Sequence, residues 1–366
     1  MFDSMKKVFV GMLTGASVVT ALLMVAVGYS DRIHPDSFPD PLLACIGLTF
    51  PFFIVANIIS LIVLLLVRWK LAVIPIVGFA LAYVPIRTYF PINLSDDGPD
   101  DCIKIVTYNV CGFGGNYRYE KAVDTVGNYL RRIDADIVCL QEVQGGKGGS
   151  GYQKMKEIYP YNDSTQISES SVLVNALGIH TRFPIIRKEI IEYQSAYNGS
   201  VAYFLQVEQD TIIVINNHLE ATHLSTDQRK RYKEVLKGEM EHDEAEEQML
   251  MILDKLADNM RKRAPQAEAV HQYVEAHSQY PIIVCGDFND TPISYTRHVM
   301  AQGLTDCFVS TGNGFGLSYN QKGFNLRIDH LMCSDHFKPY HCFVDDKMDA
   351  SDHYPLICRL KLSDNH

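Results

Sequence analysis

Three apolar runs at the start of the chain constrain its fold more than any other feature. Val8–Gly28 and Pro41–Val67 contain no charged residue, and Leu71–Ile86 has Arg87 at its edge. A helix needs about 20 apolar residues to cross the hydrocarbon core of a bilayer, and an arginine near a helix end can extend to the interface. We therefore expect a membrane domain at residues 1–94 with three transmembrane helices, at about 8–28, 41–67 and 71–90.

A cleaved signal peptide and a soluble core are the alternative interpretations of these runs. The apolar part of a signal peptide is about 7–15 residues long, whereas Val8–Gly28 is longer and two further runs follow it. Pro41–Val67 is apolar on all sides, whereas a helix in a soluble core is usually apolar along one stripe. Membrane anchoring is therefore the preferred interpretation.

The positive charges predict the orientation of these helices. Lys6 and Lys7 precede the first run, and Arg68 and Lys70 separate the second from the third. Cytoplasmic loops are enriched in such residues, so three spans would place the rest of the chain outside. We expect an integral protein of a bacterial inner or plasma membrane, with its larger domain on the outer or periplasmic side.

The nine cysteines give a weaker and opposite indication. None forms a Cys-x-x-Cys pair, so a zinc site has no support. Unpaired thiols are typical of a reducing compartment. We give the charge rule more weight, because buried thiols also survive outside the cytoplasm.

Residues 95–101 form a polar, turn-rich linker, and the pattern beyond it changes to short β-branched runs separated by helical stretches. The runs predict eight strands, at residues 103–110, 137–142, 171–179, 200–208, 211–217, 282–287, 328–334 and 354–360. The helical stretches are 119–132, 152–158 and a charged insertion around 225–277 that we expect to break near Pro265. The insertion is interpreted as a solvated amphipathic helix packed on the domain, with a membrane-surface or partner helix as the alternative. Strands mixed with helices and a hairpin predict an α/β sandwich for residues 102–362.

Polar residues follow these strands at the points where they end. The segments are TYNV at Asn109, LQEV at Glu142, NNHL at His218, GDFN at Asp287 and Asn289, RIDH at Asp329, and SDHYP at Asp352 and His353. Strand ends of a packed sheet converge on one edge, where ligand sites are common. Carboxylate and amide oxygens suit Mg²⁺ or Mn²⁺, so the pattern predicts a metal site with acid–base groups beside it.

In their order and spacing, these six segments resemble the endonuclease/exonuclease/phosphatase superfamily. The resemblance covers about Ile103 to Leu360. It implies a four-layered, deoxyribonuclease I-like α/β sandwich and metal-dependent hydrolysis of phosphoesters.

The resemblance also implies a role for each residue of the pattern. Asn109, Glu142 and Asp352 correspond to metal-site residues, with Glu142 the most direct ligand of Mg²⁺, or alternatively Mn²⁺. The catalytic set it implies is His218, Asp287, Asn289, Asp329 and His353. In that set, Asp287 and Asn289 orient the attacking water, His218 donates to a phosphate oxygen, and Asp329 supports His353. Either Asp287 or His353 remains a possible acceptor of the proton from water.

We therefore expect a membrane-anchored phosphodiesterase or phosphatase. Its substrate would be a lipid headgroup ester, a small phosphate ester or a nucleic acid, and the bilayer is its only other expected partner; no protein partner is predicted. An extracytoplasmic nuclease is the alternative, although a net charge of −10 disfavours tight binding to duplex DNA. A catalytically inactive membrane-bound binding module is the alternative from another class. The presence of Glu142, Asp287 and His353 argues against it. Glu220 and His330, beside site residues, are expected to be structural.

Overall fold

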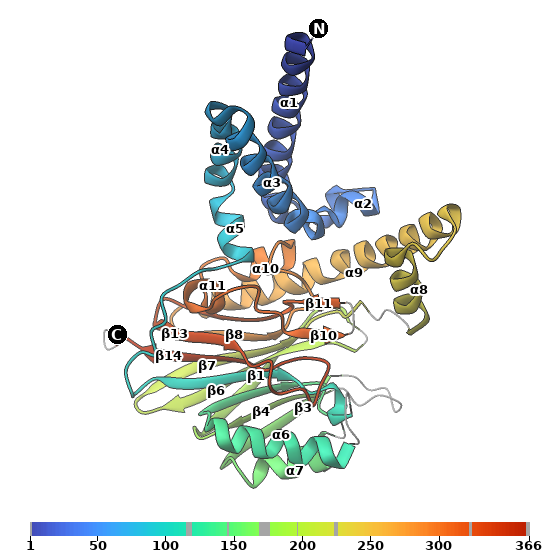
Figure 1. Ribbon diagram of the computed structural model, residues 1–366. Helices are drawn as coiled ribbons and strands as arrows, with labels where there is room; N and C mark the ends of the chain where they lie inside the picture. The colour runs from blue at the N-terminus through green and yellow to red at the C-terminus, as the bar shows by residue number, and fades with distance from the viewer. Residues whose placement is uncertain are drawn as a thin grey trace.

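The structure is a computed structural model that describes residues 2–114, 119–144, 146–167, 176–195, 197–222, 226–321 and 324–363. Figure 1 shows apolar helices that rise from one side of a sandwich of two β-sheets. The N-terminus lies at the end of these helices that is far from the sandwich.

The apolar part of the chain folds into helices that pack against one another. Its α-helices are α1 (Phe2–Gly28), α2 (Pro41–Ala44), α3 (Phe50–Arg68), α4 (Val73–Leu81) and α5 (Tyr83–Tyr89). The 3-10 turns of this part are η1 (Ser30–Arg32), η2 (Pro35–Ser37), η3 (Ile46–Thr49) and η4 (Trp69–Ala72). Both α3 and α4 pack against α1, and Asn57 Nδ2 on α3 donates to the carbonyl of Thr20 on α1 at 2.9 Å.

Two helical runs in the described chain, Met5–Arg32 and Ile46–Leu81, are long and apolar enough to cross a membrane, so the expectation of three separate spans is wrong. The expected third span is divided into α4, with nine residues, and α5, with seven. Each is far shorter than the about 20 residues that a span needs. The division lies at Ala82, whose φ of −90° and ψ of 13° end α4. The chain also reverses direction within the second run, at Arg68, where φ is −157° and ψ is 77°.

The rest of the chain forms two six-stranded sheets. In the first sheet the order is β13-β14-β1-β2-β4-β3, and in the second it is β5-β6-β7-β8-β12-β9. The first contains β1 (Ile103–Asn109), β2 (Ile137–Gln141), β3 (Tyr161–Gln166), β4 (Ala176–Thr181), β13 (Phe337–Val344) and β14 (Leu356–Leu362). The second contains β5 (Ile185–Ile191), β6 (Gly199–Val207), β7 (Asp210–His218), β8 (Ile282–Asp287), β9 (Thr305–Asp306) and β12 (Asp329–Cys333). A separate ribbon pairs β10 (Tyr319–Gln321) with β11 (Phe324–Leu326).

Helices cover the outer face of each sheet, which gives the sandwich four layers. The inner faces share one apolar core that includes Ile105 and Cys139 from the first sheet and Val214 and Cys285 from the second. The outer face of the first sheet packs on α6 (Tyr119–Ile133) and α7 (Ser150–Lys156), and that of the second on α9 (His242–Ala276) and α10 (Tyr295–Met300). The remaining helical elements are α8 (Thr226–Lys237), α11 (Cys307–Thr311), η5 (Cys111–Phe113) and η6 (Gly146–Gly148). The predicted four-layered α/β sandwich is confirmed.

Each of the eight expected strands overlaps an observed one, and residues 171–175 of the third lie outside the described chain. The expected hairpin is present as β6 and β7. The predicted break near Pro265 is wrong, because α9 continues through it from His242 to Ala276. A proline removes one N–H from a helix and crowds the preceding turn. Here burial of Ala264 and Ala267, on either side of it, holds the helix against the second sheet and its neighbours.

Polar and apolar contacts fix the apolar helices to the sandwich. Ile293, which precedes α10, packs in one buried cluster with Met24, Phe50 and Ala82 of the helices. The buried guanidinium of Arg327 donates to the carbonyl of Thr88 on α5. The helices and the sandwich are therefore packed as one unit.

All nine cysteines are free thiols, and seven of them are buried. Cys307 Sγ and Cys333 Sγ lie 3.7 Å apart without a bond. The thiols contribute mainly to the apolar core, where cysteine behaves as a small hydrophobic residue.

Two buried amides link the sheets beneath their common edge. Gln141 Nε2 on the first sheet donates to Asn216 Oδ1 on the second at 2.7 Å and to Thr107 Oγ1 at 3.0 Å. Asn216 Nδ2 donates to the carbonyls of Leu140 at 3.1 Å and Gly178 at 3.0 Å, so this amide has partners on both sides. These four hydrogen bonds between buried groups fix the position of one sheet on the other.

We predict that Asn216→Leu destabilises the sandwich, because it removes the buried bonds of Asn216 to the Gln141 amide and to the carbonyls of Leu140 and Gly178. Each unpaired buried group costs about 1–3 kcal/mol, so we expect a total loss of about 3 kcal/mol or more. Thermal unfolding of the full chain in detergent micelles measures it. The control is Asn128→Ala on the exposed face of α6, which should change stability by about 0.5 kcal/mol or less. Equal stability of the two variants would contradict the role of the network.

Candidate active site

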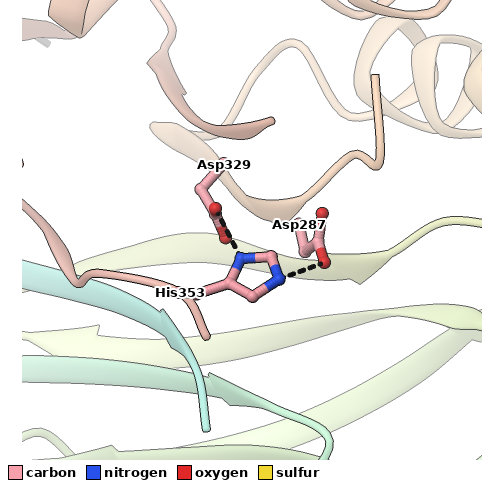
Figure 2. Close-up of side chains that lie close together, drawn as sticks. All are labelled: Asp287, Asp329 and His353. Atoms are coloured by element: carbon pink, nitrogen blue, oxygen red, sulfur yellow. Dashed lines mark hydrogen bonds and ion pairs between the residues drawn. The ribbon is translucent and has the colours of Figure 1, made fainter. Parts of the chain in front are cut away.

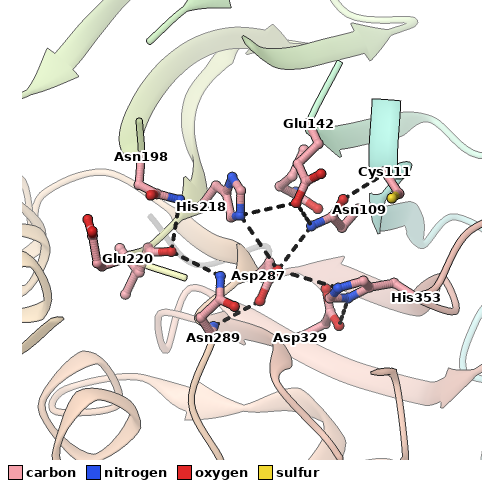
Figure 3. A network of polar contacts seen from close by, with 12 residues as sticks. Asn109, Cys111, Glu142, Asn198, His218, Glu220, Asp287, Asn289, Asp329 and His353 are labelled. Atoms are coloured by element: carbon pink, nitrogen blue, oxygen red, sulfur yellow. Dashed lines mark hydrogen bonds and ion pairs between the residues drawn. The ribbon is translucent and has the colours of Figure 1, made fainter. Parts of the chain in front are cut away.

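The parallel strand pairs bring the predicted residues to one edge of the sandwich. β1 and β2 are parallel in the first sheet, and β7 and β8 are parallel in the second. Asn109, His218 and Asp287 are the last residues of β1, β7 and β8, and Glu142 directly follows β2. β12 runs antiparallel to β8 with Asp329 opposite Asp287, so its first residue lies at the same edge. Figure 3 shows these side chains pointing toward one another.

Asn109 connects carboxylates from the two sheets. Its Nδ2 donates to Glu142 Oε1 at 3.0 Å and to Asp287 Oδ2 at 3.0 Å, while its Oδ1 accepts from the backbone N–H of Cys111 at 3.0 Å. The partners determine this orientation of the amide, because two acceptors face the nitrogen and one donor faces the oxygen. Asn109 therefore positions the carboxylates here, and ligation of a cation by its oxygen would require the amide to turn over.

Asp287 Oδ2 is the common point of the site. Besides Asn109, it faces His218 Nε2 at 3.8 Å and His353 Nε2 at 3.7 Å (Figure 3). Burial raises the pKa of Asp287 above its usual range, and the nearby Asp329 carboxylate raises it further, although the two histidines and Asn109 oppose this. Asp287 is only 1% exposed, so its ionised form depends on these neighbours.

His353 lies between two carboxylates, as Figure 2 shows. Its Nδ1 is 2.8 Å from Asp329 Oδ2, and its Nε2 faces Asp287. Burial alone would lower the pKa of His353, but the charges of Asp329 and Asp287 outweigh this and raise it to about 10. Tyr319 packs edge-on against the imidazole, with ring centroids 4.9 Å apart. The ring is therefore held in orientation by a hydrogen bond on one side and an aromatic contact on another.

Two residues of the site have a left-handed backbone. Glu142 has φ 55° and Asn289 has φ 53°. Asparagine tolerates this conformation, but for a glutamate it costs free energy and is found mostly where the surrounding structure enforces it. Its neighbours hold the turn, since the carbonyl of Glu142 accepts from Gly112 N at 3.0 Å. The strain at Glu142 supports a functional role for the carboxylate.

Asn289 and Asp352 complete the predicted set. The Asn289 backbone N–H donates to Asp287 Oδ1 at 2.8 Å, and its Nδ2 donates to the carbonyl of Leu219 at 2.9 Å. Asp352 Oδ2 accepts from Gln321 Nε2 at 3.2 Å. Both residues line the same cavity as Glu142, Asp287 and His353.

The site residues provide the chemistry that a hard divalent cation requires. The Glu142 side chain is 37% exposed. It lines the same cavity as the buried Asp287 and as Asp352. Carboxylate oxygens in this number suit Mg²⁺ or Mn²⁺. Ligand atoms of Asp287, Asp329 and His353 also lie within 4.8 Å of one another. In this cluster of three residues, His353 and Asp329 are already hydrogen-bonded to each other. Glu142 is therefore the better-placed ligand for a cation.

Three residues that support the site, Gln141, Tyr319 and Arg263, were not predicted from the sequence. Arg263 from α9 is 1% exposed; its Nε lies 3.1 Å from Asp290 Oδ2, and its Nη1 donates to the carbonyl of Glu220 at 2.9 Å. Arg263 lies in a segment rich in charged residues, so the sequence does not indicate that its side chain is buried. Asp290, which directly follows Asn289 in the GDFND segment, could have indicated that a buried cation lies nearby.

Two sequence models of protein families match this chain. Residues 106–353 match the sequence model of the Endonuclease/Exonuclease/phosphatase family, and residues 6–89 match that of a domain of unknown function (DUF8431). A comparison with curated proteins found no match.

Several solved structures share the fold. The human Nocturnin catalytic domain with bound sulfate has a TM-score of 0.52 and 14% identity, over 74% of this chain and 97% of that chain. D. rerio TDP2 complexed with a single-strand DNA product has a TM-score of 0.51 and 16% identity, over 72% of this chain and 100% of that chain. An endonuclease/exonuclease/phosphatase from Beutenbergia cavernae DSM 12333 has a TM-score of 0.50 and 14% identity, over 72% of each chain. At such identities the likeness is one of fold.

We predict that Asp329→Asn lowers the pKa of His353 by about one unit or more, because an opposite charge in contact typically shifts a pKa by about 1–3 units. Since the pKa of His353 in the folded protein is raised to about 10, the pair stabilises the fold fully below pH ~6.5 and loses that contribution as the pH rises toward 10. Imidazole NMR of the full chain in detergent measures the pKa. An unchanged pKa in the variant would contradict the assignment.

A double-mutant cycle checks whether the same pair acts as a unit. Asp329→Asn and His353→Ala should give non-additive losses of activity, when activity is normalised to folded protein. Additive losses would instead assign Asp329 a purely structural role at the start of β12.

Proposed function

Because the chain belongs to the endonuclease/exonuclease/phosphatase family, we propose that it is a membrane-anchored, divalent-metal-dependent phosphoester hydrolase. The observation that carries the proposal is the contact of Asp287 with His218, His353 and Asn109, with Glu142 on the other side of the same amide. Two carboxylates, two histidines and an amide at one sheet edge provide metal ligands, proton-transfer groups and phosphate donors together.

Glu142 would be the principal ligand of a Mg²⁺ or Mn²⁺ ion, with Asp352 as a second predicted ligand. Asn109, the third predicted ligand, would bind the ion through its oxygen after its amide turns over. A bound divalent cation would stabilise charge that develops on phosphoryl oxygens. The donor set fits such an ion because it consists of oxygens, one of which is on a carboxylate that solvent reaches.

The chain's own side chains would hold and move the protons of hydrolysis. Attack of water forms a bond from oxygen to phosphorus, breaks the bond to the leaving oxygen, and requires one proton to be removed from water and one delivered to the leaving group. Asp287 and His353 face each other at 3.7 Å and are placed to divide these two tasks. His218 would donate to a phosphate oxygen, Asn289 would help to hold the attacking water, and Asp329 would keep the His353 ring in position.

Membrane anchoring is supported by the exposure of the apolar helices. Only 17% of the residues of the first apolar window and 22% of the second are buried, unlike a core helix of a soluble protein. Phe9, Leu22, Phe52 and Leu66 are more than half exposed, as expected for side chains that face lipid. A cleaved signal sequence is disfavoured, since Met24 and Val27 of α1 pack in the cluster that includes Ile293.

The charges predict the side on which the sandwich lies. Lys6 and Lys7 near the N-terminus and Lys70 in the turn between α3 and α4 lie at the end of the helices away from the sandwich (Figure 1). With these residues cytoplasmic, the sandwich would lie on the outer or periplasmic side. Because the second apolar run reverses at Arg68, this topology rests on α1 leading toward the sandwich, α3 leading away from it, and the divided segment of α4 and α5 leading back.

A nuclease remains the second candidate, because the similarly folded D. rerio TDP2 has been solved with a single-strand DNA product. The net charge of −10 disfavours strong binding to a polyanion. An inactive binding module is disfavoured by the presence of the whole polar set. Single-stranded DNA is therefore included as a substrate in the assays below.

We predict that the full chain in detergent hydrolyses bis-p-nitrophenyl phosphate with Mg²⁺ or Mn²⁺ and stops when a chelator is added. Glu142→Gln should weaken the apparent Mg²⁺ affinity by about tenfold or more, since even changes to groups that support a ligand cost about 10–100-fold. Glu220→Gln is the matched control, because Glu220 Oε2 accepts from Ser195 Oγ at 2.8 Å and does not line the cavity. Unchanged activity of Glu142→Gln at limiting Mg²⁺ would refute the ligand assignment.

We also predict that a reporter that fluoresces only in the cytoplasm stays dark when fused after His366. The same reporter fused before Met1 should fluoresce, which controls for expression and for insertion of the protein. A bright C-terminal fusion would place the sandwich in the cytoplasm and contradict the charge argument.

A further inference from the structure

One cavity of about 340 Å³ joins the catalytic edge to the base of the apolar helices. Its polar end is formed by Glu142, Asp287 and His353, and its other end includes Leu48 and Leu256. This volume lies within the range of about 300–1,000 Å³ found for small-molecule sites. The two ends differ in chemistry, and a ligand that fills the cavity must differ in the same way along its length.

The apolar end is built from residues at the base of the apolar helices and from residues of α9. Leu48 belongs to η3 and Tyr89 to α5, both at the base of the apolar helices, while Ile252, Leu256 and Met260 belong to α9. Ile252, Leu256 and Met260 recur every four residues, so they lie along one face of α9. These three residues give α9 an apolar stretch along the cavity, which ends at Arg263, whose guanidinium is paired with Asp290.

A wholly polar phosphoester would leave this end of the cavity facing water. An alkyl chain there would remove apolar surface from water, and each buried methylene improves affinity by about fourfold when burial is complete. The position favours a chain that comes from the bilayer, because η3 leads directly into α3 and the end of α5 follows the apolar residues of α4.

We propose that the substrate is a membrane lipid with a phosphoester headgroup, whose phosphate lies at Glu142, Asp287 and His353 and whose apolar chain lies against Leu48, Leu256 and Met260. This inference rests on the proposed function and names its substrate class. The membrane helices then serve as one wall of the substrate site as well as an anchor.

The test compares alkyl p-nitrophenyl phosphates that share a leaving group and differ in the length of the alkyl chain, from methyl to dodecyl. The full chain in detergent should show a kcat/KM at least about tenfold higher for octyl than for methyl, as burial of a few methylenes requires. Leu256→Gln should reduce this ratio toward one, and the ratio compares two esters on the same folded protein, so a loss of folded enzyme does not change it. Met260→Gln is a second variant of the same wall.

Leu250→Gln is the matched control, because Leu250 lies on the same helix, is 55% exposed and does not line the cavity. It should keep the full dependence on chain length. If neither the original protein nor any of the variants hydrolyses the methyl ester, the proposed function itself is overturned. Hydrolysis of the methyl ester without any gain with chain length, or an equal gain in Leu256→Gln, would overturn only the lipid inference.

A second arm tests the bilayer as the source of the chain. The full-length protein is reconstituted in phosphatidylcholine vesicles that contain the dodecyl ester, and release of p-nitrophenolate is followed. Hydrolysis in the vesicles at a rate that falls at least about tenfold in Leu256→Gln supports a membrane lipid. Hydrolysis of the monomeric ester alone, or a preference for single-stranded DNA over all esters, overturns it.

Discussion

The active edge of this protein depends on one amide nitrogen shared by two carboxylates. Asn109 Nδ2 donates to Glu142 from the first sheet and to Asp287 from the second, and both bonds are 3.0 Å long. Two anionic groups so close together repel each other unless a donor or a cation lies between them. Both bonds require that the two sheets pack with the ends of β1, β2, β7 and β8 at one edge. The buried hydrogen bond between Gln141 and Asn216, beneath this edge, fixes that alignment.

Much of the fold and the position of the site followed from the sequence. Strands were recognised where β-branched residues are buried on both faces, as in Ile282–Asp287, and the polar residues that end them reached one edge because parallel strands share a direction. The orientation of Asn109 could not be predicted, since it depends on the Cys111 N–H and on a carboxylate 178 residues away in the chain. The edge strands β5 and β13 were not predicted, because their residues are partly buried and mix polar with apolar side chains.

The errors concern places where packing overrides local preference. Pro265 does not end α9, because burial of its neighbours against the second sheet and α10 outweighs the lost hydrogen bond. The third apolar run is not a single helix, because the chain turns at Ala82 on its way to the sandwich. The same return path brings Tyr89 to the wall of the cavity and Thr88 to Arg327. The apolar helices and the catalytic edge are therefore parts of one arrangement, and a substrate that is both apolar and phosphorylated fits both.

The central claim is that a divalent cation and a phosphoester meet at Glu142 and Asp287. Anomalous diffraction from crystals of the full-length protein grown with Mn²⁺ tests it most directly, because the signal locates the ion without reference to activity. We expect a peak within about 2.3 Å of a Glu142 carboxylate oxygen, a little longer than the ~2.0–2.1 Å of Mg²⁺. A peak centred instead among Asp287, Asp329 and His353, or no peak at this edge at saturating Mn²⁺, would contradict it.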